Sequence, residues 1–453
     1  MPRNRKKSEN QRSAWGTPVL GLGLVLLGIL GLLILLTPLG GKVKRGLRLL
    51  RVNRTAEFVN EKEKSNSDSG VSASPDPLSP LESDPDPPFP RGVLTPPDGV
   101  DIRQLSKGID LKVIFDSSAG ELASMERTNR EAYLAEYALR GRMPRAATTP
   151  EELTLTSPHL LEILPGLKMM LTRAEVSAWY RQIYANKSAR LKDNVGRLDE
   201  VLSKHNFYDC ETMLNLRSQE SGQRLFLLQA EMDVVSDGSD GDRLARMPDE
   251  IVGSTNYQPF TSYRWKKSGA TPNPMIAGWE RRIGNARREI GEEGTGQERK
   301  DWLRSRIKML EAGIADMKIA SFLIADYDPF IVVPINILAD RRDPYAPNIG
   351  DFAVVVHERT AYPAIVGDAG PSFKVGEASL RMAREINASA TPYSRPVSDL
   401  TVTYLVFPRS ADDPKRAPDY SHWRKRCGEL VDKIGGLGEG VELHEWKDLL
   451  PAE

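Results

Sequence analysis

Apolar residues follow three different patterns along the chain, and the first is a long uninterrupted run near the N-terminus. From Pro18 to Leu39 no residue is charged, and Leu, Ile, Val and Gly dominate. A helix of this length spans about 33 Å, more than the roughly 30 Å of a bilayer's hydrocarbon core. The run is longer than the apolar part of a signal peptide, and a basic stretch follows it. Residues 18–39 are therefore predicted to form an uncleaved transmembrane helix rather than a cleaved leader.

The second pattern is helical and covers residues 101–205. Apolar side chains recur every three or four positions around 119–140 and again from about 172 to 202. The segment 149–152, Thr-Pro-Glu-Glu, has the form of a helix start. Aromatic residues on one face of such helices are most often buried in a core, so this region is predicted to be a helical layer without chemistry of its own.

The third pattern, short apolar runs bounded by turn residues, is typical of β-strands and begins after residue 206. It predicts strands at 224–235, 331–338, 352–357, 362–366 and 400–407. A strongly charged block at about 275–319 interrupts these runs and is predicted to be an inserted helical hairpin. The predicted fold class is α+β: a compact β domain with a helical layer and a helical insertion, preceded by one transmembrane helix.

Composition separates these parts of the 453-residue chain. Positions 1–54 contain eleven Lys or Arg and one acid, whereas positions 55–100 contain three and nine. Nine prolines lie between 75 and 97 among Ser and Asp, a composition that buries little and stays extended. The predicted organisation is a basic N-terminal tail at 1–17, the transmembrane helix at 18–39, a basic juxtamembrane segment and Pro/Ser/Asp-rich linker at 40–100, the helical region at 101–205 and the β domain at 206–453.

Charge and cysteine content exclude several function classes. The chain has 62 basic and 62 acidic residues, so the +10 and −6 of its first two stretches leave −4 for residues 101–453. A mildly acidic body argues against nucleic acid as a partner. Two cysteines, Cys210 and Cys427, are too few for a disulfide scaffold or a four-ligand zinc module, and the sequence leaves their pairing open. The five histidines show no metalloprotease spacing, and no cofactor is expected.

Two carboxylates stand out in a segment dense in turn residues. Asp368 follows the apolar run 362–366, and Glu377 follows Gly376 at the start of a helix-like stretch. Two carboxylates across a cleft are the minimum for hydrolysing a glycosidic bond, since one donates a proton and the other activates water or attacks carbon. The alternative is structural: Asp368 caps a turn, and Glu377 favours the dipole at a helix N-terminus. On spacing alone the structural interpretation is favoured.

A second acidic group contains Asp233, Asp237 and Asp240. Its Asp-Gly-Ser-Asp-Gly-Asp run is superficially similar to a calcium loop, but Pro248 stands where such a loop has its twelfth-position Glu. The alternative is a turn whose acids bind a cationic ligand.

Several motifs occur in one order along the chain and together resemble the chitosanases of glycoside hydrolase family 75. These motifs are Ala230-Glu-Met-Asp-Val-Val-Ser-Asp-Gly, Asn256-Tyr-Gln-Pro-Phe-Thr-Ser-Tyr, Asp328-Pro-Phe-Ile-Val-Val-Pro, Gly350-Asp-Phe-Ala-Val-Val-Val and Gly367-Asp followed by Gly376-Glu-Ala-Ser. The resemblance covers roughly 208–408. It implies an inverting endo-hydrolase of β-1,4-linked glucosamine, with Asp368 and Glu377 as the essential acids. It is also compatible with a compact barrel, for which the double-psi type would suit the order strand, Asp, turn and helix.

The chain departs from the family at several points. Ala369-Gly370 stands where fungal members tend to have Thr-Asn, and the cysteines near the first motif are missing. The helical layer, the linker and the insertion are additions to the compact secreted enzyme.

The resulting hypothesis is a membrane-tethered, chitosanase-like hydrolase. Asp368 is assigned as base and Glu377 as general acid, with the reverse left open, and Lys374 is expected to face solvent because it would oppose a protonated Glu377. The partners are a polysaccharide such as chitosan, whose ammonium groups Asp233, Asp237 and Asp240 would bind, and the membrane through 18–39. Charged residues flank that helix almost equally, so the expectation of a body outside the cytoplasm depends on the substrate, which cannot cross a bilayer. The alternatives are a non-catalytic cell-envelope protein that binds glycan or a partner on the same fold, and a membrane scaffold.

Overall fold

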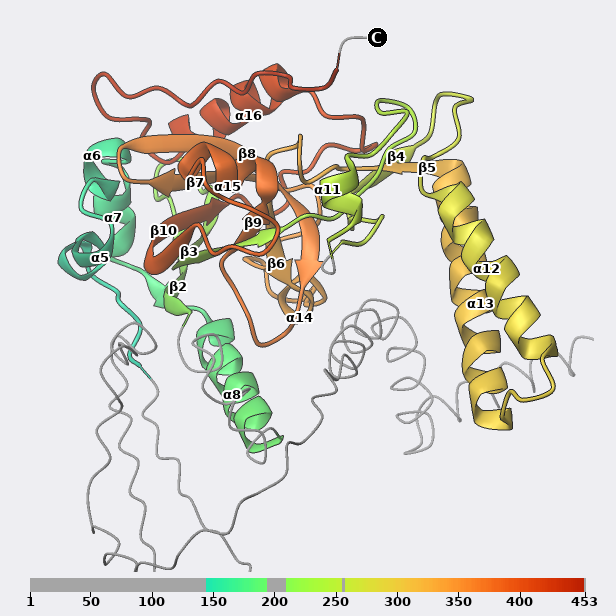
Figure 1. Cartoon of the computed structure of the whole chain (residues 1–453). Coiled ribbons are helices and arrows are strands. Elements are labelled where there is room, and N and C mark those ends of the chain that lie inside the picture. Colours follow the sequence, from blue (N-terminus) through green and yellow to red (C-terminus); the bar gives the residue numbers. More distant parts are fainter. Residues whose placement is uncertain (1–143, 194–208, 255–256, 452–453) are drawn as a thin grey trace, which may run out of the picture. The chain divides into compact units, whose positions relative to one another are not determined.

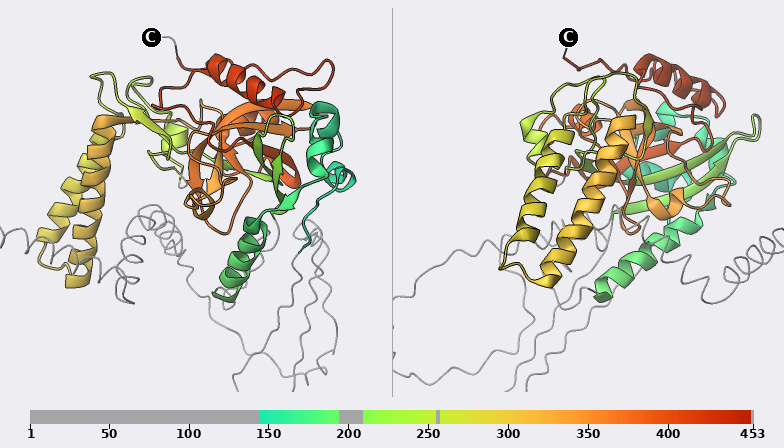
Figure 2. Two further views of the ribbon diagram at one scale, coloured as in Figure 1. Left: turned by 180° about the vertical axis from the view of Figure 1, so that it is seen from behind. Right: turned by 90° about the vertical axis from the view of Figure 1, so that its right-hand side faces the viewer.

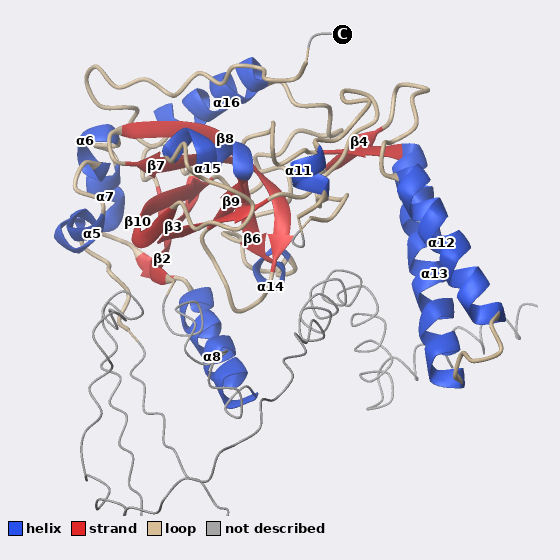
Figure 3. Cartoon of the chain, in the orientation of Figure 1, coloured by secondary structure: helices blue, strands red, loops and turns tan. Residues whose placement is uncertain are grey.

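The computed structural model describes residues 144–193, 209–254 and 257–451, which form a closed six-stranded β-barrel with helices packed around it (Figures 1 and 3). The strands follow one another in the order β3–β10–β7–β8–β6–β9, and β9 pairs with β3 to close the ring. Their bounds are β3 (Arg224–Val235), β6 (Phe330–Pro334), β7 (Phe352–His357), β8 (Thr360–Gly370), β9 (Glu377–Ser379) and β10 (Val397–Val406). The α+β class and the barrel are thus confirmed.

The ring closes through the end of its longest strand. One edge of β3 pairs with β2 (Cys210–Arg217) as far as Ala230 and then, from Asp233 on, with β9. Strand β2 therefore lies outside the ring, where β1 (Glu175–Val176) extends the sheet. Two pairs in the ring, β3–β9 and β6–β8, are parallel and the other four are antiparallel. The double-psi type remains a prediction.

The barrel strands are buried on both faces, which explains why they read as nearly continuous apolar runs. Alternate residues of β3, among them Phe226 and Met232, belong to the cluster that fills the barrel. Their neighbours Leu225 and Leu227 belong to a second cluster on the outer face. That outer cluster also includes side chains from α16 (Tyr420–Asp432) and from three short N-terminal helices, α5 (Pro150–Thr156), α6 (Leu160–Ile163) and α7 (Leu167–Leu171).

The start of α5 has the local signals that the sequence predicts. The Thr149 side chain accepts a hydrogen bond from the Glu152 backbone N–H, and the Glu152 carboxylate accepts one from the Thr149 backbone N–H. This reciprocal capping satisfies donors that the first turn of a helix leaves open. A longer helix, α8 (Ala178–Asp193), follows β1 and packs Tyr180, Ile183 and Tyr184 into the cluster that fills the barrel.

The segment predicted as an insertion forms α12 (Ile276–Gly291) and α13 (Gln297–Ile319). These helices run side by side, and the antiparallel strand pair of β4 (Arg264–Lys266) and β5 (Ala320–Phe322) joins them to the rest of the fold (Figure 2). Their contact depends on Gly313, because a Cβ added there would lie 2.4 Å from the Trp279 ring.

The structure differs from the prediction in two details, the end of one strand and the position of Glu377. The run 331–338 is a strand only to Pro334, because proline has no N–H for the ladder, and the chain then turns into α14 (Ile335–Leu338). Glu377, expected in or beside the first turn of a helix, lies in the short strand β9, directly before α15 (Leu380–Ile386), whose N-cap is Ser379. A further short helix, α11, covers Asp249–Val252. Cys210 and Cys427 are both buried and free.

The prediction of a membrane location is corrected. In the three described ranges, no helix has the length and apolar character needed to cross a bilayer. The longest helix described, α13, has 23 residues but carries charges along its length. The expected single-pass localisation, with the body outside the cytoplasm and the membrane as a partner, therefore has no support. Residues 18–39, with the tail and the linker, lie outside the described residues.

Candidate active site

Strand pairing brings the two predicted catalytic carboxylates to one face of the barrel. Asp368 of β8 lies opposite Val332 of β6, and Val332 on its other side lies opposite Glu377 of β9. Glu377 in turn lies opposite Asp233 of β3. Residues that lie opposite one another on neighbouring strands project from the same face of a sheet. Since Val332 belongs to the outer cluster, the three acids lie on the outer face of the barrel.

A shift in register sets this alignment. Ile331 pairs with Val366, but the next residue of β6, Val332, pairs with Asp368, so β8 contains one extra residue at Gly367. Such bulges re-aim the side chain that follows them. Without the shift, the Asp368 side chain would project from the face of the sheet opposite to that of Val332 and Glu377.

Within the described part of the chain, the hydrogen bonds that Asp368 accepts come from uncharged groups. Its Oδ1 atom accepts from the Ser262 backbone N–H at 2.9 Å, the Ser262 hydroxyl at 2.6 Å and the Ala369 N–H at 2.8 Å. Burial outweighs these bonds and raises the pKa of Asp368 to about 6, with a smaller contribution from the negative charge of Glu377. Ser262 itself is exposed, so this acid lies at the edge of solvent. The loop that carries Ser262 is held to β8 by a hydrogen bond from Tyr263 N–H to Gly367 O of 2.8 Å.

Glu377 has a cationic neighbour instead. Its Oε1 atom lies 2.8 Å from Lys374 Nζ, and the residue is buried. Burial alone would lower the pKa of Lys374, but the carboxylates of Glu377 and Asp233 raise it above its ordinary value. Lys374 therefore stays charged and stabilises negative charge on Glu377. The expectation that Lys374 faces solvent is wrong.

Two glycines make room for this arrangement. A Cβ on Gly370 would lie 2.7 Å from Glu377 Oε2, so a glycine at this position leaves room for that carboxylate. Gly376 has φ +74°, and a Cβ there would lie 2.2 Å from Glu231 O. Gly376 O also accepts the Asp233 N–H at 2.6 Å, which starts the β3–β9 pairing.

The structure places the three predicted substrate-binding acids in different surroundings. Asp233 is buried and paired with two cations: its Oδ1 lies 2.7 Å from Arg395 Nε and its Oδ2 lies 3.0 Å from Lys374 Nζ. Asp237 is half-buried and accepts the Gln258 N–H at 2.6 Å. Asp240 is fully buried, accepts the Asp242 N–H at 2.7 Å and lies 2.5 Å from Arg243 Nε. These three acids do not form one cluster with a shared ligand.

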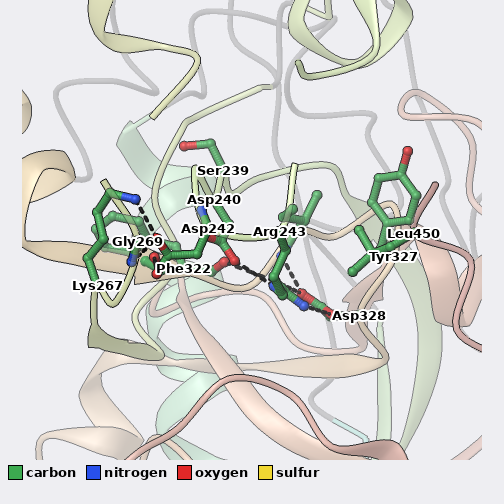
Figure 4. A network of polar contacts seen from close by, with 12 residues as sticks. Ser239, Asp240, Asp242, Arg243, Lys267, Gly269, Phe322, Tyr327, Asp328 and Leu450 are labelled. Atoms are coloured by element: carbon green, nitrogen blue, oxygen red, sulfur yellow. Dashed lines mark hydrogen bonds and ion pairs between the residues drawn. The ribbon is translucent and has the colours of Figure 1, made fainter. Parts of the chain in front are cut away.

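The Asp240 pair belongs to a structural network that Figure 4 shows. Arg243 also binds both carboxylate oxygens of Asp328, at 2.8 and 2.9 Å, and Asp328 accepts the Ile324 N–H at 2.6 Å. Beside it, Asp242 lies 2.5 Å from Lys267 Nζ and accepts the Ser268 and Gly269 N–H groups. The network joins the loop after β3 to the β4–β5 strand pair, at Phe322 of β5 and at Lys267, which follows β4.

A calcium site finds no support in this loop. Asp240 and Asp242 already bind Arg243 and Lys267, and no group of three or more His, Cys, Asp or Glu in the described part of the chain is arranged to hold a metal ion.

Sequence reasoning missed Ser262 and Arg395 and misplaced Lys374. Ser262 lies in the Thr-Ser-Tyr end of the motif that begins at Asn256, so the motif contained a signal. Arg395 lies 162 residues from Asp233, and nothing in its local sequence indicates the contact.

The chain was compared with models of protein families and with curated proteins. Residues 232–441, just under half of the chain, match the family described as fungal chitosanase of glycosyl hydrolase group 75. The match contains Asp233, Asp368 and Glu377. A search of curated proteins finds no match. The chain therefore contains a chitosanase-like domain of glycosyl hydrolase group 75.

Proposed function

We propose that the protein is an endo-acting, inverting chitosanase-type hydrolase of β-1,4-linked glucosamine polymers. The observation that carries this proposal is the pair of carboxylates on one face of the barrel, placed on either side of β6 in different electrostatic surroundings. The family match supports the reaction class and a polysaccharide substrate.

The surroundings favour Asp368 as the general acid and Glu377 as the base, the reverse of the roles assigned from the sequence. A carboxyl group whose pKa is about 6 keeps much of its proton near that pH and can give it to the leaving glycosidic oxygen. Glu377, whose negative charge Lys374 stabilises at 2.8 Å, takes a proton from water as that water attacks the anomeric carbon from the opposite side.

The backbone spacing supports inversion. Asp368 and Glu377 are on strands separated by one strand, so their Cα atoms lie roughly 9–10 Å apart at the usual strand spacing. Inverting enzymes need carboxyl groups about 6.5–9.5 Å apart to admit the water, whereas retaining pairs are about 5 Å apart. Carboxyl groups carried at this backbone separation can lie within the inverting range.

Among the predicted substrate-binding acids, Asp237 is the best candidate for an ammonium group because it is half-buried rather than enclosed. Asp233 is assigned to holding Lys374 and Arg395. Asp240 is left out because it is buried against Arg243.

The test uses the full chain and partly N-acetylated chitosan. Wild-type protein should release reducing ends and lower the viscosity of the solution early, as an endo-acting enzyme does. Asp368→Asn and Glu377→Gln should each lose roughly 10²–10⁴-fold in kcat. Glu439→Gln, which changes an exposed carboxylate near the C-terminus, is the matched control and should keep wild-type activity.

Two further measurements separate the alternatives. Proton NMR of the first product should show the inverted anomer, and the retained anomer would refute the proposed geometry. If wild-type protein binds chitosan without cleaving it, the non-catalytic glycan-binding alternative holds instead.

A further inference from the structure

Helix α8 lies outside the segment that matches the family, yet it contacts the loop that leads into β9. This loop, residues 371–376, joins β8 to β9 and carries Lys374, the cation that contacts both Glu377 and Asp233. Helix α8 holds this loop at three places. Two of the contacts are direct, and the third passes through the carboxylate of another residue.

The first contact is buried and indirect, because a lysine of α8 reaches the loop through a carboxylate. Lys187 of α8 is 2 % exposed, and its Nζ lies 2.7 Å from Oδ2 of Asp209, which is fully buried. The same oxygen accepts the backbone N–H of Val375 at 3.1 Å. A cation of α8 thus fixes the carboxylate that holds the backbone directly after Lys374.

The other two contacts hold the start of the loop. Asn186 Nδ2 donates to Ser372 O at 2.6 Å, and the Arg190 guanidinium lies over the Phe373 ring at 4.3 Å from its centroid. The three residues of α8 are at positions i, i+1 and i+4, so about one turn of helix spans the loop from Ser372 to Val375.

We propose that α8 positions the catalytic carboxylates, and that Lys187 is a positioning residue which acts through Asp209 and the loop to hold Lys374 against Glu377. The inference rests on the proposed function, since it assigns the loop a part in that reaction. It also means that the segment matching the family is not sufficient for full activity.

Stability alone is a weak reason for this arrangement. A fully buried Lys–Asp pair gains little over apolar side chains of the same size, because both charges must be removed from water. Precise placement gains more, since a shift of about 1 Å in a catalytic group can cost on the order of 100-fold in rate. The pair fixes the backbone beside Lys374 in one position, which an apolar contact would not do.

The experiment compares Lys187→Met and Asn186→Ala with wild type in the full chain. Lys187→Met keeps the length of the side chain and removes its charge, and Asn186→Ala removes one hydrogen bond from a half-buried site without opening the core. Lys192→Met, a change of an exposed lysine on the same helix, is the matched control. Kinetics on chitosan and hydrogen exchange of the peptide covering 371–377 are both measured.

Lys187→Met should lower kcat about tenfold or more while KM stays within about twofold, and Asn186→Ala should lower it several-fold. Exchange in 371–377 should rise in both variants, and Lys192→Met should match wild type.

Unchanged kcat and unchanged exchange of 371–377 in Asn186→Ala and Lys187→Met, with wild-type protein active, would overturn the inference. So would a fall in activity that only follows the fraction of unfolded protein. If wild-type protein cleaves nothing, the proposed function fails, while hydrogen exchange still reports whether α8 holds the loop.

Discussion

The raised pKa of Asp368 predicts that replacing this acid will stabilise the protein at neutral pH while removing its activity. Burial raises the pKa of Asp368 from its ordinary 3.8 to about 6 in the folded protein. Between these values the folded state holds a proton that the unfolded state has released. Wild-type stability therefore falls as pH rises from about 4 to about 6, and the full cost is present above that range.

The magnitude follows from the two pKa values. Their difference, about 6 minus 3.8, corresponds to about 3 kcal/mol at about 1.4 kcal/mol per pH unit. Asp368→Asn removes this cost and keeps an oxygen that accepts from Ser262 and Ala369. At pH 7.5 its thermal midpoint should exceed that of wild type by several degrees, since 1 kcal/mol shifts the midpoint of a domain of this size by about 2–4 °C.

The assay is thermal unfolding of the full-length wild-type and Asp368→Asn proteins, followed by circular dichroism at several pH values between 4 and 8. The difference between their midpoints should be small at pH 4, grow through pH 5–6 and level off above pH 7. Glu439→Gln, which changes an exposed carboxylate and keeps Asp368, should follow wild type throughout. An Asp368→Asn variant that is less stable than wild type at pH 7.5, or a difference independent of pH, would refute the reasoning.

Three further changes test separate parts of the site. Ser262→Ala removes the 2.6 Å hydroxyl bond that favours ionised Asp368, so the alkaline limb of the pH–rate profile should move to higher pH, and an unmoved limb would count against Asp368 as the acid. Gly370→Ala places a Cβ 2.7 Å from Glu377 Oε2 and should lower kcat more than tenfold, whereas wild-type kinetics would show that the carboxylate can move aside. Arg243→Met leaves two buried carboxylates without their cation and should cost about 3–5 kcal/mol in chemical unfolding; a cost below 1 kcal/mol would contradict the structural role of the network.

Much of the barrel could be predicted from the sequence because its strands are apolar on both faces. The segments 224–235 and 352–357 were predicted with the bounds that β3 and β7 have. Strand β9 was missed because it has only three residues and gains its hydrogen bonds from β3 and β6, which are remote in sequence. A short run of this kind carries no periodicity, so its strand form depends on tertiary pairing.

The site could be predicted in part. The family motifs pointed to Asp368 and Glu377, but the roles of the two acids depend on neighbours that the motifs do not specify. Lys374 lies three residues before Glu377. Its side chain turns inward to pair with Asp233, which is on a strand far away in the sequence. The acids at 233, 237 and 240 form one group in the sequence, but the strand end and loop after residue 233 separate them in space.

The two carboxylates have different surroundings because their strands, β8 and β9, pair with opposite edges of β6. Strand β8 lies beside the loop of Ser262, which offers a hydroxyl and a backbone N–H but no charge. Strand β9 lies between β6 and β3, and the acid of β3 at position 233 holds Lys374 and Arg395 in place. The neutral donors do not offset the cost of burying a charge at Asp368, and its pKa is raised, whereas Glu377 has the cation of Lys374 beside it. In the proposed mechanism, the closed barrel thus presents an acid and a base on one face, and the proposed role of the helix outside the matched segment is to hold the lysine that distinguishes them.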